Sequence, residues 1–142
     1  MSLTSYASTR ILNYNFGGTA YPLGLPSSYF FGLSTTTGEP DFITPVLVEP
    51  TGVGSYARKE FVNNKPNWKD ALTTGILTNN VAIEFVASTA DWGTIYKVGM
   101  WDALTGGNLW WWDSLSPSRA VPSLTTVILS ADSVSIRFNN TA

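Results

Sequence analysis

The side chains on which most catalytic mechanisms depend are missing from this chain. Its 142 residues include no His and no Cys. A Ser-His-Asp or Cys-His site is therefore excluded, and so are thiolate metal sites and disulfides. The ten Asp and Glu residues are scattered and never form an Asp-x-Asp-x-Asp loop, so we expect no metal and no cofactor. The sequence predicts a protein that is not an enzyme.

One pair of carboxylates could still act on a sugar, because glycoside hydrolysis needs only two carboxyl groups at a set separation. Asp102 and Asp113 flank the turn signal Thr105-Gly106-Gly107-Asn108. A hairpin at that turn would bring the two carboxylates face to face beside Trp101. So short a hairpin leaves little room for a cleft. We therefore expect contact with a glycan at Trp101, Asp102 and Asp113 before we expect its hydrolysis.

The tryptophans are the most unusual feature of the sequence. Six occur in 142 residues, and Trp110, Trp111 and Trp112 are consecutive. Neighbours in a strand point to opposite faces, so at least one of these rings is expected to point outward. An outward Trp indicates contact with another chain or with a ligand. Subunit contact is the favoured interpretation, while a large core covered by loops and a carbohydrate platform stay open.

Charge and hydropathy narrow the range of partners. Only 13% of residues are charged, against about 25% in a typical domain, which favours a surface covered by other chains. The net charge of −2 gives no basic excess for nucleic acid. Lys65 and Lys69 are too few for single-strand binding, so Trp68 between them is expected to hold its loop against the body. No apolar run suits a signal peptide or the roughly 18 residues of a membrane span, so we expect no membrane contact.

The first predicted element is a short helix, and strands follow it. Leu3, Ala7, Ile11 and Tyr14 fall at helical spacing after the cap residues Thr4 or Ser5, and Gly17-Gly18 ends the pattern. Alternating β-prone segments between turn signals predict strands at Ser28 to Thr35, Ser55 to Asn63, Val81 to Val86, Thr94 to Ala103, Leu109 to Asp113, Ser123 to Ser130 and Ser133 to Phe138.

Two proline-containing segments interrupt this series. Residues 41–50 carry two prolines and an apolar run, which predicts an extended arm or an edge strand. Ser116-Pro117-Ser118 is expected to break the chain. About seven short strands predict one all-β domain over residues 1–142, an antiparallel β-sandwich or Greek-key barrel. In it, residues 1–18 form the short N-terminal helix and its turn.

An ordered series of motifs resembles a group of small virion structural proteins of tailed phages, described as tail fibre or head decoration proteins. It spans about three quarters of the chain and comprises Phe16-Gly17-Gly18-Thr19-Ala20-Tyr21, Phe31-Gly32-Leu33-Ser34-Thr35, Glu49-Pro50 through Gly54-Ser55-Tyr56-Ala57-Arg58, Trp68, Trp92-Gly93-Thr94-Ile95, and Trp101-Asp102-Ala103 to Gly106-Gly107-Asn108-Leu109. The resemblance implies a β-sandwich that self-associates in the particle without catalysis. The chain departs from the group at Trp110 to Trp112 and at Asp41 to Val48, and both departures fit contacts specific to one assembly.

Three functions are weighed from these observations. The favoured one is a capsid decoration (cement) protein, a homotrimer that binds the major capsid protein or another virion protein. Its interface is expected to include the three consecutive tryptophans and the arm residues Phe42, Val46 and Val48. The alternative is a tail fibre or adhesin module that binds host glycan through Trp side chains, and the third is a small glycan-acting enzyme. The first two place the protein on the virion after assembly in the host cytoplasm.

Overall fold

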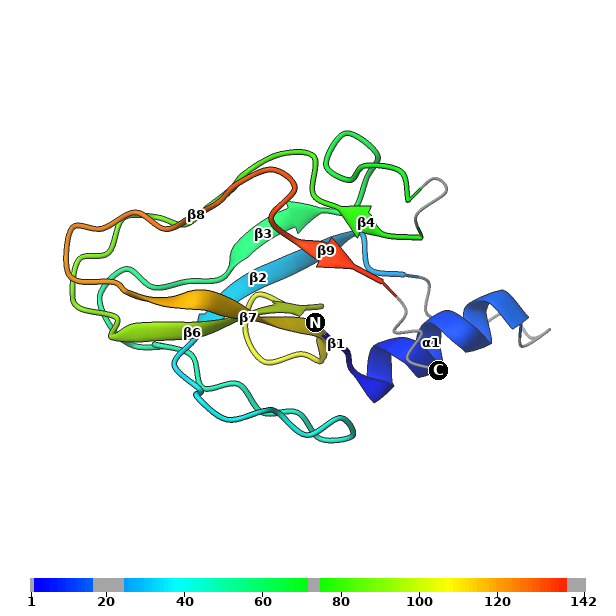
Figure 1. Ribbon diagram of the computed structural model, residues 1–142, viewed down its shortest axis with the longest axis horizontal. Helices are drawn as coiled ribbons and strands as arrows, with labels where there is room; N and C mark the ends of the chain where they lie inside the picture. The colour runs from blue at the N-terminus through cyan, green and yellow to red at the C-terminus, as the bar shows by residue number, and fades with distance from the viewer. Residues whose placement is uncertain (1, 17–24, 72–74, 138–142) are drawn as a thin grey trace.

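The main element of the fold is a five-stranded antiparallel sheet. A computed structural model describes residues 2–16, 25–71 and 75–137. The strand order is β1-β7-β6-β2-β3, from β1 (Ser2–Leu3), β7 (Leu109–Ala120), β6 (Thr94–Trp101), β2 (Ser28–Ser34) and β3 (Lys59–Val62). Two short antiparallel ladders lie over one face of this sheet and form a second layer (Figure 1). The prediction of an all-β fold with a short N-terminal helix is confirmed.

The N-terminal helix α1 (Ser5–Phe16) begins where the sequence predicts. Thr4 caps it, because its hydroxyl accepts a hydrogen bond from the backbone N–H of Ala7 at 3.3 Å. The same hydroxyl donates to the carbonyl of Leu109 at 2.6 Å, and this bond ties the helix start to β7. Ala7 is fully buried, so the first turns pack on the body while Phe16 at the far end is 82% exposed. Gly17-Gly18 lies outside the described residues.

The central strands follow the predicted pattern closely. β2 pairs with β6 so that Phe31 stands opposite Met100 and Gly32 opposite Gly99. Phe31 and Leu33 are fully buried, as alternation in a half-buried strand requires. β3 is shorter than predicted and pairs with the other edge of β2. The expectation that Trp68 holds its loop is confirmed, since the ring is buried and lies 4.9 Å from that of Phe61.

The predicted break at Ser116-Pro117-Ser118 is wrong, because β7 continues through it to Ala120. The strand accommodates the proline at an irregularity: Arg119 pairs with Ile95, but the next pair is Ser114 with Lys97. The extra residues of β7 form a bulge. Residues in a bulge do not have to donate a backbone hydrogen bond to the neighbouring strand, so a proline is tolerated there. β1 pairs only with Trp111 and Trp112, so the rest of that edge of β7 has no strand partner among the described residues.

The second layer contains less strand than predicted. β5 (Ile83–Glu84) pairs with β8 (Ile128–Leu129), and β4 (Leu77–Thr78), which was not predicted, pairs with β9 (Ser135–Ile136). Side-chain hydrogen bonds supplement the backbone pairing here. The buried amide of Asn79 donates to the carbonyls of Val81 and Ser130, both at 2.9 Å, and accepts from the N–H of Val134 at 2.9 Å. Phe138, predicted to point inward, lies outside the described residues.

Both faces of the main sheet are covered. The large core between the layers includes Phe31, Val98, Met100 and Trp111. A smaller cluster of Trp101, Leu109 and Trp112 lies apart from that core, with Leu47 of the arm packed against it. The arm passes below the sheet in the view of Figure 1, on the side away from the second layer. Among the described residues, no helix is long and apolar enough to cross a membrane.

Candidate functional site

Two facing glycines create a flat area on the face of the sheet that the arm covers. Gly32 and Gly99 are register partners in β2 and β6, and the indole of Trp101 lies against both. A Cβ on Gly99 would stand 2.5 Å from Cη2 of Trp101 and 2.8 Å from Cδ1 of Leu47. A Cβ on Gly32 would stand 2.8 Å from the same indole, so only glycine permits this close packing.

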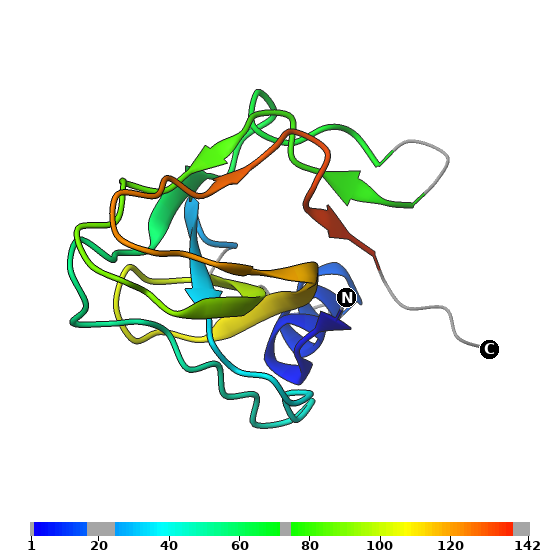
Figure 2. The same cartoon turned by 60° about the vertical axis from the view of Figure 1, so that its left-hand side comes forward.

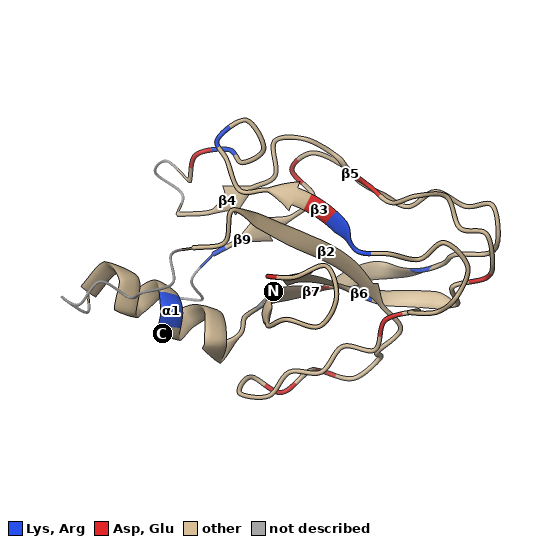
Figure 3. Cartoon of the chain, turned by 180° about the vertical axis from the view of Figure 1, so that it is seen from behind, with Lys and Arg blue, Asp and Glu red and all other residues tan. Residues whose placement is uncertain are grey.

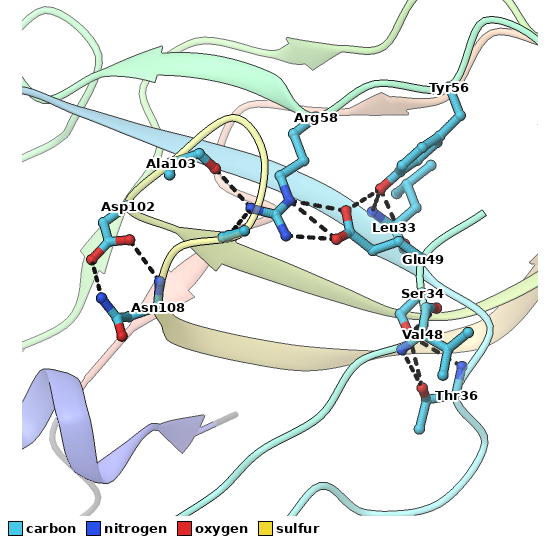
Figure 4. A network of polar contacts seen from close by, with 11 residues as sticks. Leu33, Ser34, Thr36, Val48, Glu49, Tyr56, Arg58, Asp102, Ala103 and Asn108 are labelled. Carbon is cyan, nitrogen blue, oxygen red and sulfur yellow. Dashed lines mark hydrogen bonds and ion pairs between the residues drawn. The ribbon is translucent and has the colours of Figure 1, made fainter. Parts of the chain in front are cut away.

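Arg58 closes the other side of the Trp101 ring. Its guanidinium carbon lies 4.0 Å from the ring centroid, a cation–π stack. Nε and Nη2 donate to the Glu49 carboxylate at 2.7 to 3.1 Å, and Nη1 donates to the carbonyls of Ala103 and Gly106, each at 2.7 Å (Figure 4). Both charged side chains are only 8% exposed. The Arg58 guanidinium therefore links Glu49, at the end of the arm, to the turn between β6 and β7.

Tyr56 completes this group, which we call the Arg58 cluster (Glu49, Tyr56, Arg58 and Trp101). Its hydroxyl donates to Oε1 of Glu49 at 2.6 Å and accepts from the N–H of Leu33 at 2.9 Å. Burial and the hydrogen bond to the carboxylate raise the pKa of Tyr56 far above its usual value, so the phenol stays a donor. A pocket of about 330 Å³ adjoins the cluster, lined also by Thr51, Leu104 and Thr105.

Asp102 organises the adjoining turn. Its carboxylate accepts bonds from the backbone N–H of Asn108 at 2.7 Å, from the Asn108 side chain at 3.0 Å and from the indole N–H of Trp110 at 3.2 Å. Burial alone would raise the pKa of Asp102, but these bonds outweigh burial and lower it. Gly107 has φ +73°, and a Cβ there would stand 2.6 Å from the Asp102 carboxylate, so the tight turn requires glycine.

The predicted face-to-face pair of Asp102 and Asp113 is wrong. β6 and β7 pair in a register that places Asp113 opposite Val98, while Asp102 follows the last paired residue of β6. The two carboxylates therefore do not form one site across the turn. Trp101 is only 6% exposed and both faces of its ring are occupied, so it offers no open surface for sugar stacking. A glycan contact through these three residues stays untested.

The expectation that one of the three consecutive tryptophans points outward is also wrong. Trp110, Trp111 and Trp112 are 2%, 2% and 7% exposed. The rings do point to different sides, but each side is covered. Trp111 lies in the large core, Trp112 lies in the smaller cluster beside the arm, and Trp110 packs edge-on against Tyr6 and Tyr29 at 5.7 and 5.4 Å. Of the interpretations left open by the sequence, the core covered by loops fits their position.

The arm presents several apolar side chains to the outside, and its predicted role in an interface stays a prediction. Phe42, Val46 and Val48 are 55%, 69% and 58% exposed, and Ile43 is exposed as well. The arm forms no regular strand, but the Val48 carbonyl accepts from the N–H of Thr35 at 2.9 Å and from the Ser34 hydroxyl at 2.8 Å. Near its start, the backbone N–H of Ser5 donates to the Phe42 carbonyl at 3.1 Å. The arm is therefore held at both ends, with its apolar side chains outside.

A buried lysine was missed by sequence reasoning. Lys97 is 2% exposed, and its Nζ lies 3.1 Å from the Ser114 hydroxyl, 3.7 Å from the Glu39 carboxylate and 5.0 Å from the Trp112 ring centroid. The alternation of β6 assigned it to one face of the strand, and nothing in the sequence indicated that loop residues would cover that face. Other charges are spread thinly over the chain (Figure 3). Among the described residues, no three Asp or Glu side chains gather as a metal site would require.

The motifs that carry the phage resemblance converge on this region. Gly32, Glu49, Tyr56, Arg58 and the Trp101-Asp102 turn come from three separate motifs and contact one another. The chain matches the model of a family described as Podophage GP4 fiber I protein gp80 over residues 2–137. Because the match covers nearly all of the sequence, the chain belongs to this family of podophage fibre proteins. A comparison with curated proteins found none that matches it.

Proposed function

We propose that the protein is a non-catalytic fibre component of the virion, attached to its neighbours in the particle through the arm. The observation that carries the proposal is the match of residues 2–137 to a fibre family. This match favours the tail fibre alternative over capsid decoration. Homotrimer formation and binding to the major capsid protein stay predictions from the sequence.

The structure of the arm supports the attachment. Four apolar side chains, Phe42, Ile43, Val46 and Val48, are exposed on one short segment, and clustered apolar exposure marks contact surfaces. The Arg58 cluster holds the end of the arm, since Glu49 follows Val48 directly. A contact segment that is already ordered loses less entropy on binding than a flexible one. By holding the end of the arm in place, the hydrogen bonds of the Arg58 cluster therefore favour binding of the arm to a neighbouring protein.

The position in the particle tests the proposal. An antibody to the protein, imaged on intact virions, is expected to label the tail region at a few positions. Labelling distributed over the whole head would overturn the fibre assignment and restore capsid decoration.

The arm is tested separately by substituting Val46→Ser. We expect a folded protein that is incorporated into particles poorly, because an interface anchor costs roughly 1–2 kcal/mol or more when truncated. Val86→Ser is the matched control, since Val86 is 67% exposed against 69% for Val46 and lies outside the arm. Equal incorporation of both variants would refute attachment through the arm.

A further inference from the structure

A leucine stands on an exposed turn in a backbone conformation that leucine disfavours. Leu124 has φ +66° and is 86% exposed. It is the third residue of the turn 122–125, the orange bend between β7 and β8 at the left of Figure 1. A positive φ at the third residue of a turn is normally adopted by glycine or asparagine. The conformation is therefore strained for leucine, and the few contacts of so exposed a side chain offset little of that strain.

Ser88 holds the turn in this conformation, and Ser88 is fully buried. Its carbonyl accepts a hydrogen bond from the N–H of Leu124 at 2.8 Å. Its hydroxyl donates to the carbonyl of Pro122 at 2.7 Å and accepts from the N–H of Thr125 at 3.0 Å. The turn is therefore held on both sides of Leu124, and it presents the leucine side chain in a fixed position outside the body.

Asp132 shows what an ordinary explanation for such a conformation looks like. It has φ +65°, which short polar side chains tolerate, and its carboxylate accepts bonds from Lys69 at 2.5 Å and from Thr78 at 3.0 Å. The Leu124 side chain belongs to neither of the two apolar cores of the described residues. Strained residues tend to persist where they serve a function. The position of Leu124 therefore indicates a contact outside its own chain.

A pocket of suitable size and character adjoins the Arg58 cluster. Its volume is about 330 Å³, and its walls include Tyr56, Gly106 and the half-exposed Leu104. Deleting one buried leucine side chain from a protein core leaves a cavity of roughly 150 Å³, so this pocket is large enough for a leucine. The charged residues in its wall, Glu49 and Arg58, pair with each other at 2.7 Å. The pocket therefore suits an uncharged, apolar side chain.

We propose that Leu124 of one copy of the chain inserts into the pocket at the Arg58 cluster of a second copy. The turn 122–125 carries no charged side chain and the charges of the pocket are paired internally, so the two surfaces meet without like-charge repulsion. Leu124 does not line the pocket of its own chain, so the contact joins two different patches of the surface. Such a head-to-tail contact closes into a ring or extends as a filament. The inference goes beyond the proposed function, because it requires no particular place in the particle.

Sedimentation velocity of the full chain over a series of concentrations tests this contact. The parent is expected to associate as its concentration rises, and Leu124→Gly is expected to weaken the association roughly tenfold or more, the effect of losing one buried leucine. The same variant is expected to unfold at an equal or higher urea concentration, because glycine removes the strain at positive φ. Leu124→Asn is the second variant, since asparagine also tolerates this conformation. A lower urea midpoint in both variants would overturn the proposal, because Leu124 would then stabilise its own fold.

A mixture of two variants tests the pairing of the leucine with the pocket. Leu104→Glu places a carboxylate at the pocket and keeps Leu124, whereas Leu124→Gly keeps the pocket. Each variant alone is expected to stay monomeric at concentrations where their equimolar mixture forms a dimer and nothing larger. Leu12→Glu is the matched control, because Leu12 and Leu104 are both 51% exposed and Leu12 lies on α1, outside the pocket. This control is expected to associate as the parent does.

Three results would overturn the contact between copies. A parent that stays monomeric would mean that Leu124 contacts a different protein or none. A mixture that does not associate would mean that the leucine and the pocket are not partners, and an equal loss in Leu12→Glu would mean that α1 mediates the association. These measurements on purified protein are independent of the antibody labelling of virions, so either proposal can fail without the other.

Discussion

Removing the guanidinium of Arg58 is expected to destabilise the protein strongly. Arg58→Met keeps much of the aliphatic stem but deletes three bonds to Glu49 and two to the turn carbonyls. It leaves a carboxylate that is 8% exposed without its cation. Breaking a buried ion pair on one side costs about 3–5 kcal/mol. Against a total stability of about 5–15 kcal/mol, this loss is a large fraction.

The assay is urea unfolding, followed by tryptophan fluorescence, of a double-mutant cycle with Glu49→Gln. If the charges interact as the geometry indicates, the double variant is more stable than the sum of the two single losses predicts, by at least about 1 kcal/mol. The expected fall in melting temperature for Arg58→Met is roughly 10 °C. Lys59→Ala is the control, because Lys59 is the next residue of the chain and is exposed.

Two results would refute this reasoning. A loss below about 1 kcal/mol in Arg58→Met would mean that the cluster contributes little to stability. Strict additivity in the cycle would mean that Arg58 acts through its stack on Trp101 or its turn carbonyls and not through Glu49.

The other predictions concern close packing, acid stability and the exposure of the arm. Gly99→Ala is expected to cost about 1–3 kcal/mol by overpacking against the indole, measured by urea unfolding, while Gly38→Ala, where a Cβ meets nothing within 4 Å, is expected to be neutral; equal stability of the two would contradict the packing. Folding lowers the pKa of Asp102, so the ionised carboxylate stabilises the folded protein. This stabilisation is fully present above the pKa of an unfolded carboxyl group, near 4, and is lost as the pH falls through the lower pKa of the folded state. Asp102→Asn is therefore expected to show a shallower fall in stability below about pH 4 than the parent, and an unchanged acid slope would argue against this role. Phe42→Ser is expected to leave the unfolding free energy within about 0.5 kcal/mol of the parent, as for an exposed site, and a larger loss would mean that the ring packs within its own chain.

The central strands and the helix could be predicted because their signals are local. The alternation of Phe31 and Leu33, the cap at Thr4 and the glycines at 106 and 107 each act within a few residues. Hydrophobic periodicity and characteristic turn residues therefore identify these elements directly from the sequence. The family resemblance depended on the same short motifs, and the family match agrees with it.

The errors arose where a distant segment changes the environment of a strand. Alternation predicts which side Trp112 faces, but only the return of the arm with Leu47 makes that side an interior. The same covering segment encloses Trp101. The regular register of β6 and β7 places Asp113 opposite Val98, well before Asp102 in the strand. In the second layer, the segments predicted as strands of six to eight residues keep only two-residue ladders, with scattered backbone bonds such as that from Phe85 N–H to the Val127 carbonyl beyond them. Such long-range contacts have no periodic signature in the sequence.

Beyond its pairing with β1, the outer edge of β7 meets no strand among the described residues, and this affects how the protein behaves at high concentration. Exposed strand edges recruit the edges of other copies, most readily at high protein concentration. Along residues 114–120 this edge bulges, contains Pro117 and carries the charge of Arg119, three features that discourage edge-to-edge growth. Replacing Pro117 and Arg119 together by Thr would regularise this edge, and we expect that variant to form insoluble aggregates at concentrations where the parent stays dispersed.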